Sequence, residues 1–176
     1  AGVDEFVNAV TCSVYGTTEE KIKEDFECDP ESPYGEAKLE AEQEMFDRWS
    51  GEMGLTGLRL GTVYGWTTGM RFDTVVDKFA YLAAIGQPLT VYEGAEDQKR
   101  PYLHVQDAVR SMMFAADELG DGEAYNVVGQ NGRLQDVVDA IERHFPNVEI
   151  GYTEAEQLNQ LSYIVSDEKI RDEGFE

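Results

Sequence analysis

Apolar and polar positions follow two alternating patterns along the chain. Short apolar runs rich in β-branched and aromatic residues predict buried or extended strands at 5–11, 55–64, 89–92, 100–105, 124–128 and 148–152. Longer segments with apolar residues three and four positions apart predict amphipathic helices at 33–53, 72–85, 106–119 and 134–145, with a short helix near 167–172. Residues 17–31 are acidic and are expected to form a surface loop. Because strands alternate with helices, the pattern predicts an α/β protein with a parallel sheet.

The longest predicted helix begins with a start signal and carries a chemically interesting pair. Ser32 suits the N-cap and Pro33 the first helical position. Tyr34 and Lys38 are four residues apart, so both side chains lie on one face of the helix. Positive charge beside a phenol favours the phenolate form, which suits a general acid/base. Taken alone, such a pair is more often an ordinary surface contact.

Composition excludes several classes of protein. An apolar content of 41% is enough for a packed core, and no apolar stretch is long enough to span a membrane. The net charge of −22 disfavours nucleic acid and anionic membranes as partners. The first residues have neither a basic nor an apolar region, so no secretory signal is expected. Cys12 and Cys28 are expected to be free thiols, no residues have metal-ligand spacing, and we expect a cytoplasmic protein.

Six sequence blocks in fixed order resemble one enzyme family. They are TCSVYG (11–16), SPYGEAK (32–38), RLGTVYG (59–65), PLTVY (88–92), RPYLHVQD (100–107) and YNVV (125–128). Together they resemble the extended short-chain dehydrogenase/reductases, and more narrowly the NAD-dependent epimerase/dehydratase family that acts on nucleotide sugars. The resemblance covers essentially the whole chain.

The family resemblance implies a particular fold. This sequence would be the C-terminal part of a Rossmann-type doubly wound parallel sheet, made by 1–65 and 100–130, with a small α/β substrate lobe made by 66–99 and 131–176. No segment here has the strand, Gly-rich turn and helix that cradle the cofactor pyrophosphate. The family places that turn in an N-terminal segment, so we expect weak or absent NAD binding by these residues alone.

The resemblance also implies catalytic and cofactor-binding roles. Tyr34 would exchange a proton with a sugar hydroxyl, while Lys38 would hold the nicotinamide ribose. Thr11 would hydrogen-bond the reacting oxygen, with Ser13 as the alternative. The cofactor would be NAD, with NADP not excluded, and its site would be formed by Tyr34, Lys38, Leu60 and Thr62.

The implied substrate is a nucleotide sugar. Arg100 matches a family arginine that binds the diphosphate, as bidentate charge-assisted pairing suits. The expected substrate-binding residues are Ser13, Thr62, Arg71, Thr90, Tyr92, Arg100 and Tyr163, with Thr90 and Tyr92 beside the nucleobase. Two positions depart from the family: Thr62 replaces a common asparagine, and 159–162 lack a second phosphate-binding arginine. Arg71 is a candidate to compensate.

The reaction type can be narrowed within the family. Dehydratases have acidic residues directly after the Thr11 position, whereas this chain has Cys12 and Ser13. Epimerisation of a nucleotide sugar is therefore the favoured reaction. The alternatives are a dehydrogenase or reductase acting on a sugar or small carbonyl compound, and a non-catalytic fragment. Family members commonly form homodimers through the Tyr34 helix, where Leu39, Met45 and Trp49 are candidate contacts.

The one-sided charge also predicts a protein adapted to high salt. Repulsion among the 36 acidic side chains destabilises the fold, and salt screens that repulsion. We expect the midpoint of thermal unfolding to rise between about 0.1 M and molar KCl. Equal or higher thermal stability at the lower concentration would contradict this adaptation.

Overall fold

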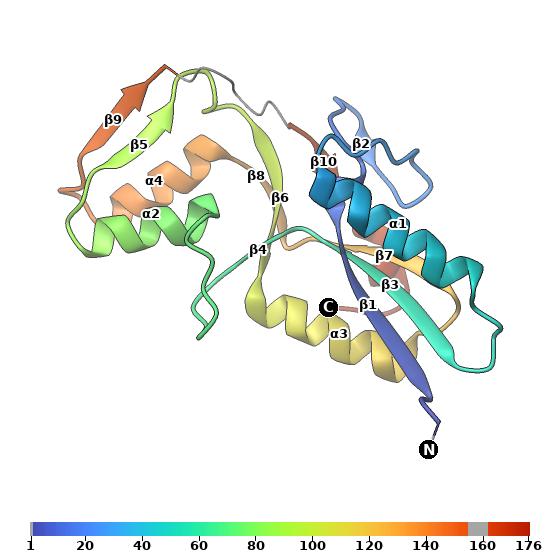
Figure 1. Ribbon diagram of the computed structural model, residues 1–176. Helices are drawn as coiled ribbons and strands as arrows, with labels where there is room; N and C mark the ends of the chain where they lie inside the picture. Colours follow the sequence, from blue (N-terminus) through green and yellow to red (C-terminus); the bar gives the residue numbers. More distant parts are fainter. Residues whose placement is uncertain (1, 155–161) are drawn as a thin grey trace.

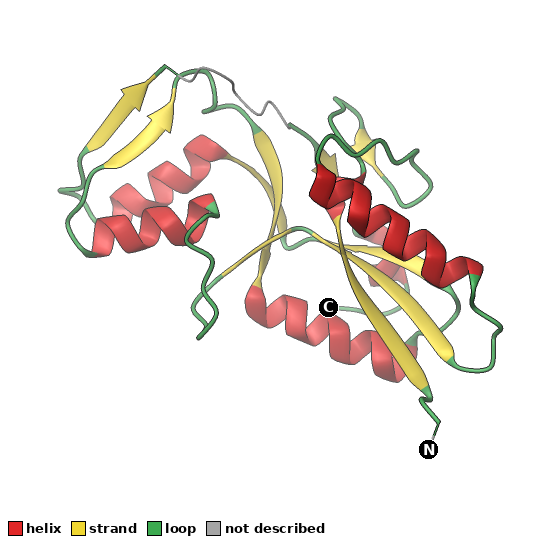
Figure 2. Cartoon of the chain, in the orientation of Figure 1, coloured by secondary structure: helices red, strands yellow, loops and turns green. Residues whose placement is uncertain are grey.

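Helices and strands alternate along the chain in a computed structural model that describes residues 2–154 and 162–176 (Figures 1 and 2). The helices are the short 3₁₀ helix η1 (Cys12–Val14), α1 (Pro33–Asp47), α2 (Val75–Ala84), α3 (Val105–Glu118), α4 (Leu134–His144) and α5 (Glu168–Asp172). The strands are β1 (Glu5–Thr11), β2 (Lys21–Ile22), β3 (Gly54–Leu60), β4 (Thr62–Tyr64), β5 (Leu89–Tyr92), β6 (Lys99–His104), β7 (Glu123–Val127), β8 (Gln130–Arg133), β9 (Ile150–Thr153) and β10 (Ile164–Val165). None of the described helices has the length and apolar character needed to span a bilayer.

One of the two three-stranded sheets is parallel, in the order β1-β3-β7, and is called the large sheet because β1 and β3 are the longest strands. Helices cover both of its faces (Figure 1). Alternation along the central strand β3 decides which side chains meet which helix. Leu58 and Leu60 face α3 and join a core with Ala108 and Ala115. Arg59 points the other way, toward α1. The predicted α/β class with a parallel sheet is therefore confirmed.

The predicted strand 55–64 is wrong as a single element, because the chain changes sheets at Gly61. Gly61 N still donates to Val127 O at 3.0 Å, and β4 then pairs with β6 in a separate sheet. A Cβ atom at Gly61 would lie 2.9 Å from Pro101 O, so only glycine fits this crossing without displacement of the neighbouring strand. The apolar run is continuous across this point, so the pattern alone does not mark the break.

A smaller layered unit is formed by β5, β9, α2 and α4. β5 and β9 pair in parallel, and both helices pack on the resulting ribbon (Figure 1). Phe79 and Ala83 of α2 and Val138 and Ile141 of α4 fill its core with Leu89. The apolar stripes predicted for both helices are therefore the faces that they bury.

Several predicted boundaries differ from the structure. The helix predicted over 33–53 ends at Asp47, and Trp49 then donates its indole N–H to Met53 O at 2.7 Å in the turn that follows. The helix predicted over 72–85 begins at Val75. The expected loop 17–31 contains β2, which pairs with β10. These short strands and β8 carry no long apolar alternation, so backbone pairing alone reveals them.

The C-terminal residues do not all belong to the unit predicted for them. The division of the chain into a dinucleotide-binding part and a substrate lobe remains a prediction. Residues 131–176 were assigned to the substrate lobe, but α5 packs against β7 and Ile170 and Phe175 join the core of the large sheet. Two of the three predicted dimer contacts, Leu39 and Trp49, have partners within the chain. Leu39 packs against the cluster around Val10 and Trp49 is bonded to Met53 O. A homodimer remains a prediction.

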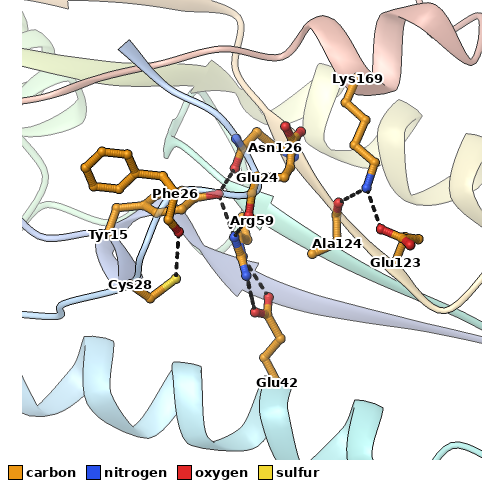
Figure 3. Close-up of polar contacts among 10 residues, drawn as sticks. All are labelled: Tyr15, Glu24, Phe26, Cys28, Glu42, Arg59, Glu123, Ala124, Asn126 and Lys169. Carbon is orange, nitrogen blue, oxygen red and sulfur yellow. Dashed lines mark hydrogen bonds and ion pairs between the residues drawn. The ribbon is translucent and has the colours of Figure 1, made fainter. Parts of the chain in front are cut away.

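A buried polar network ties α1 to the sheet (Figure 3). Arg59 and Glu42 are 8% and 2% exposed, and Arg59 Nη2 donates to Glu42 Oε1 at 2.6 Å. Arg59 Nη1 also donates to the Tyr15 hydroxyl at 2.7 Å. That hydroxyl in turn donates to Asn126 Oδ1 at 2.7 Å. Burial raises the pKa of Tyr15 despite the opposing charge of Arg59, so the phenol stays a donor.

Cys12 and Cys28 are free thiols, as predicted.

We expect Arg59→Met to lower the free energy of unfolding by about 3–5 kcal/mol, because it leaves the Glu42 carboxylate buried without a partner. Arg59→Met combined with Glu42→Leu should recover most of that loss. The control is Arg48→Met, which removes an exposed ion pair with Glu44 and should cost less than about 1 kcal/mol. Urea unfolding measures all three variants, and equal losses for Arg59→Met and Arg48→Met would contradict the expectation.

Candidate active site

The carboxyl ends of two parallel strands bring the first site residues together. In the β1–β3 register Thr11 lies beside Leu60, so both residues end their strands at the same edge of the sheet. Thr11 then starts η1, where its Oγ1 accepts a hydrogen bond from Ser13 N at 3.2 Å. Thr11 Oγ1 also donates to Ser13 Oγ at 3.2 Å. The two candidate hydroxyls therefore form one pair.

The start of α1 lies directly against this hydroxyl pair. The Ser32 side chain accepts from Gly35 N at 3.1 Å, which fixes the N-cap predicted from the sequence. A Cβ atom at Gly35 would lie 2.9 Å from Ser13 O, so glycine permits the close approach of α1 to η1. The neighbouring Tyr34 is 55% exposed. Lys38, one turn later, donates from Nζ to Ala9 O at 2.9 Å and so anchors the helix to β1.

One cavity of about 360 Å³ contains most of the predicted site residues. These are Thr11, Ser13, Tyr34, Lys38, Leu60, Thr62, Arg71 and Tyr163. Residues from β1, α1, β3 and the chain tail thus converge on one hollow. Its described lining contains hydroxyl, phenol, ammonium and guanidinium groups and no carboxylate. Such a donor-rich surface suits sugar hydroxyls and an oxyanion.

A second cavity of about 460 Å³ contains the other predicted residues, Thr90, Tyr92 and Arg100. It shares Thr62 and Thr74 with the first cavity, so the two hollows are neighbours. Strand β5 alternates here, with Leu89 and Val91 buried and Thr90 and Tyr92 exposed. Lys78 and Gln98 also line this cavity and are not among the residues predicted from the sequence. The stripe that makes α2 amphipathic does not indicate which polar side chains border a hollow.

Tyr163 joins the first cavity through a long-range backbone contact. Its N–H donates to Lys99 O at 3.1 Å, which brings the chain tail back beside β6. Burial, with a smaller effect of Cys12, raises the pKa of Tyr163 to about 12, and the neighbouring Ser13 and Arg100 oppose that shift. The Tyr163 phenol is therefore neutral at physiological pH and can donate a hydrogen bond.

Arg71 and Cys12 each have a hydrogen-bond partner outside the substrate position. Arg71 lines the first cavity but is exposed and donates from Nη2 to Asp73 Oδ2 at 2.7 Å. Burial raises the pKa of the Cys12 thiol, which donates to Arg59 O at 3.1 Å. Cys12 is thus a neutral thiol turned toward β3. No group of three or more metal-ligating side chains occurs in the described part of the chain.

A protein-family model described as the NAD dependent epimerase/dehydratase family matches residues 1–128. The chain belongs to this family. Its relatives include the uncharacterized UDP-glucose epimerase YtcB of Bacillus subtilis (strain 168), 31% identical over 147 residues, which are 80% of this chain and 44% of YtcB. The family resemblance drawn from the six sequence blocks is therefore confirmed.

Solved structures of epimerase/dehydratase family type share the fold. The UDP-glucose 4-epimerase of Thermus thermophilus, in complex with NAD, is 25% identical with a TM-score of 0.81, covering 98% of this chain and 58% of that chain. MoeE5, in complex with UDP-glucose and NAD, is 29% identical with a TM-score of 0.83, covering 97% of this chain and 58% of that chain. The chain thus spans about half the length of the relatives it matches.

The raised pKa of Tyr163 predicts a pH-dependent contribution to stability. The folded-state pKa of about 12 exceeds the usual value of 10.0, so this contribution is complete below about pH 10 and is lost as the pH rises toward 12. Between about pH 8 and pH 10.5 the wild type should therefore lose roughly 1 kcal/mol more than Tyr163→Phe. Urea unfolding at both pH values measures the difference, and parallel losses in the two proteins would contradict it.

Proposed function

We propose that this chain carries the catalytic and substrate-binding residues of an NAD(P)-dependent nucleotide-sugar epimerase, with Tyr34 as the acid/base. The observation that carries the proposal is the convergence of Thr11, Ser13, Tyr34 and Lys38 on one cavity that adjoins the Arg100 cavity. The relatives that contain UDP-glucose or NAD support the same assignment.

The residues present fit a nicotinamide cofactor. The first cavity opens at the carboxyl ends of β1 and β3, where dinucleotides bind in open parallel sheets. Lys38 uses one of its three N–H donors on Ala9 O, which leaves two for ribose hydroxyls. Leu60 and Thr62 would form the adjoining wall. When bound, NAD supplies the acceptor and donor of a hydride.

Tyr34 has the position and exposure that proton transfer requires. Its phenol borders the cavity and is accessible, whereas Tyr163 is buried and held neutral. Tyr34 would take the proton from a sugar hydroxyl. It would return the proton after the oxidised sugar has rotated to present its opposite face. The Thr11 and Ser13 hydroxyls would hydrogen-bond the same sugar oxygen.

Epimerisation is favoured over dehydration by the chemistry of the cavity lining. Elimination of water needs an acid and a base beside the reacting carbons. Among the described residues no carboxylate lines the first cavity, and the Cys12 thiol is bonded to Arg59 O. Transient oxidation and reduction at one carbon needs one proton-transfer group, which Tyr34 would supply, and a hydride acceptor, which NAD would supply.

The second cavity would hold the nucleotide. Arg100 supplies a guanidinium for phosphate, and Thr90 and Tyr92 present a hydroxyl and an aromatic ring for a base. UDP-glucose, which MoeE5 binds, is the first substrate to test. Assembly as a homodimer through α1 remains part of the proposal.

A dehydrogenase or reductase is the second candidate, because the same tyrosine and lysine serve hydride transfer without epimerisation. The two activities differ in the state of the cofactor. An epimerase converts UDP-glucose while no NADH accumulates, which absorbance at the reduced nicotinamide band measures. Accumulation of NADH in step with product would instead establish the dehydrogenase. If the protein that carries this chain converts no sugar when NAD is supplied, the chain would be non-catalytic.

We expect Tyr34→Phe to lower kcat by about 100-fold or more in the protein that carries this chain, because it removes the proton-transfer group. The midpoint of thermal unfolding should stay unchanged, since the side chain is exposed. Tyr152→Phe is the matched control, because Tyr152 is 51% exposed on β9 and lines neither cavity. Near-wild-type turnover by Tyr34→Phe would remove Tyr34 from the catalytic role.

A further inference from the structure

Most cations of this acidic chain are neutralised by carboxylates. Acidic residues outnumber the 14 lysines and arginines by 22. Nine of these cations form salt bridges within the described residues: Lys21, Lys23, Arg48, Arg59, Arg71, Arg110, Arg133, Lys169 and Arg171. Lys38 is bonded to a backbone carbonyl instead. A cation left without a carboxylate is therefore an exception in this protein.

Besides Lys38, four cations have no carboxylate partner among residues 2–154 and 162–176, namely Lys78, Lys99, Arg100 and Arg143. Two of them, Lys78 of α2 and Arg100 of β6, line the same 460 Å³ cavity. These residues come from different elements, so the fold brings two free positive charges to one hollow. Asp73 also lines the cavity, but its carboxylate is already paired with Arg71.

The rest of the lining suits a ligand with one charged and one flat apolar part. Phe79, Val91 and Leu134 supply apolar surface, and Thr90 and Gln98 supply polar groups at the edge. The cavity volume lies within the range of small-molecule sites. An anion bound here gains local attraction from two cations, while the distant carboxylates are screened beyond about 10 Å at 0.1 M salt.

We propose that Lys78 and Arg100 together bind the two phosphoryl groups of a diphosphate ester, so that Lys78 serves as a second phosphate-binding cation of the nucleotide site. This inference rests on the proposed function and deepens it. A sugar nucleotide carries one negative charge on each phosphoryl group, which matches two separate cations. Arginine offers a fork of donors and lysine a compact point charge, and both are common phosphate ligands.

Isothermal titration calorimetry of the 176-residue chain with UDP-glucose and with UMP tests the proposal. The second cavity is lined by residues of this chain, so nucleotide binding can be measured without NAD. We expect Lys78→Gln and Arg100→Gln each to weaken UDP-glucose binding about tenfold, because each removes one charge-assisted contact. Only one of the two variants should weaken the binding of UMP, because its single phosphate can contact either Lys78 or Arg100 but not both.

The controls separate a specific contact from a general change in charge. Arg143→Gln removes an equally unpaired cation outside the cavity and should leave the affinity for UDP-glucose unchanged. Lys78→Arg should restore most of the affinity that Lys78→Gln loses. Lys78 is exposed, so Lys78→Gln and Lys78→Arg should keep the wild-type midpoint of thermal unfolding.

Three results would overturn the proposal. These are unchanged UDP-glucose binding by Lys78→Gln, equal weakening of UDP-glucose and UMP by both variants, and absence of binding by the wild type. The first two results leave the proposed epimerase in place, because turnover by Tyr34→Phe tests that function separately. The third is likewise separate from the proposed function, which turnover of UDP-glucose by the protein that carries this chain tests.

Discussion

The position of α1 depends on two charged contacts made by one face of the helix. Tyr34, Lys38 and Glu42 are spaced four residues apart and share this face. Lys38 donates to Ala9 O on β1, and Glu42 binds Arg59 on β3. Through Tyr15 the same arginine reaches Asn126 on β7. The helix that carries Tyr34 is thus held to all three strands of the large sheet, whose ends carry Thr11 and Leu60.

This attachment explains how an acidic helix can be placed accurately. The exposed side of α1 carries Glu36, Glu40 and Glu44 and gains little from apolar burial. A buried ion pair is costly to desolvate and strongly directional, so it specifies one orientation of the helix more than it adds stability. We infer that the buried ion pair of Glu42 and Arg59 fixes the position of α1 and thereby the geometry of the first cavity. The two unpaired cations of the second cavity then set its preference for an anion.

The sequence pattern predicts the parallel sheet and the main helices, and the family resemblance names several of the residues that line the two cavities. Alternation of buried runs and amphipathic stripes is sufficient for the layers, and the Tyr34 and Arg100 blocks supply candidate residues that the fold brings to the two cavities. The pattern did not reveal the change of sheets at Gly61, because the apolar run continues through it. Arg59 within that run and Glu42 on a helix gave no sign that they pair. Lys78 was missed because its role depends on which elements enclose the cavity, and that is a property of tertiary structure.

The central claim is that Tyr34 and its neighbours serve epimerisation by reversible hydride transfer at one carbon of a nucleotide sugar. The most direct measurement gives the protein that carries this chain UDP-glucose with deuterium at C4, in ordinary water with NAD, and follows the label in the product by mass spectrometry and NMR. We expect UDP-galactose that retains the deuterium, because the hydride leaves and returns without exchange with solvent. Loss of the label to water, or a dehydrated product, would contradict the account.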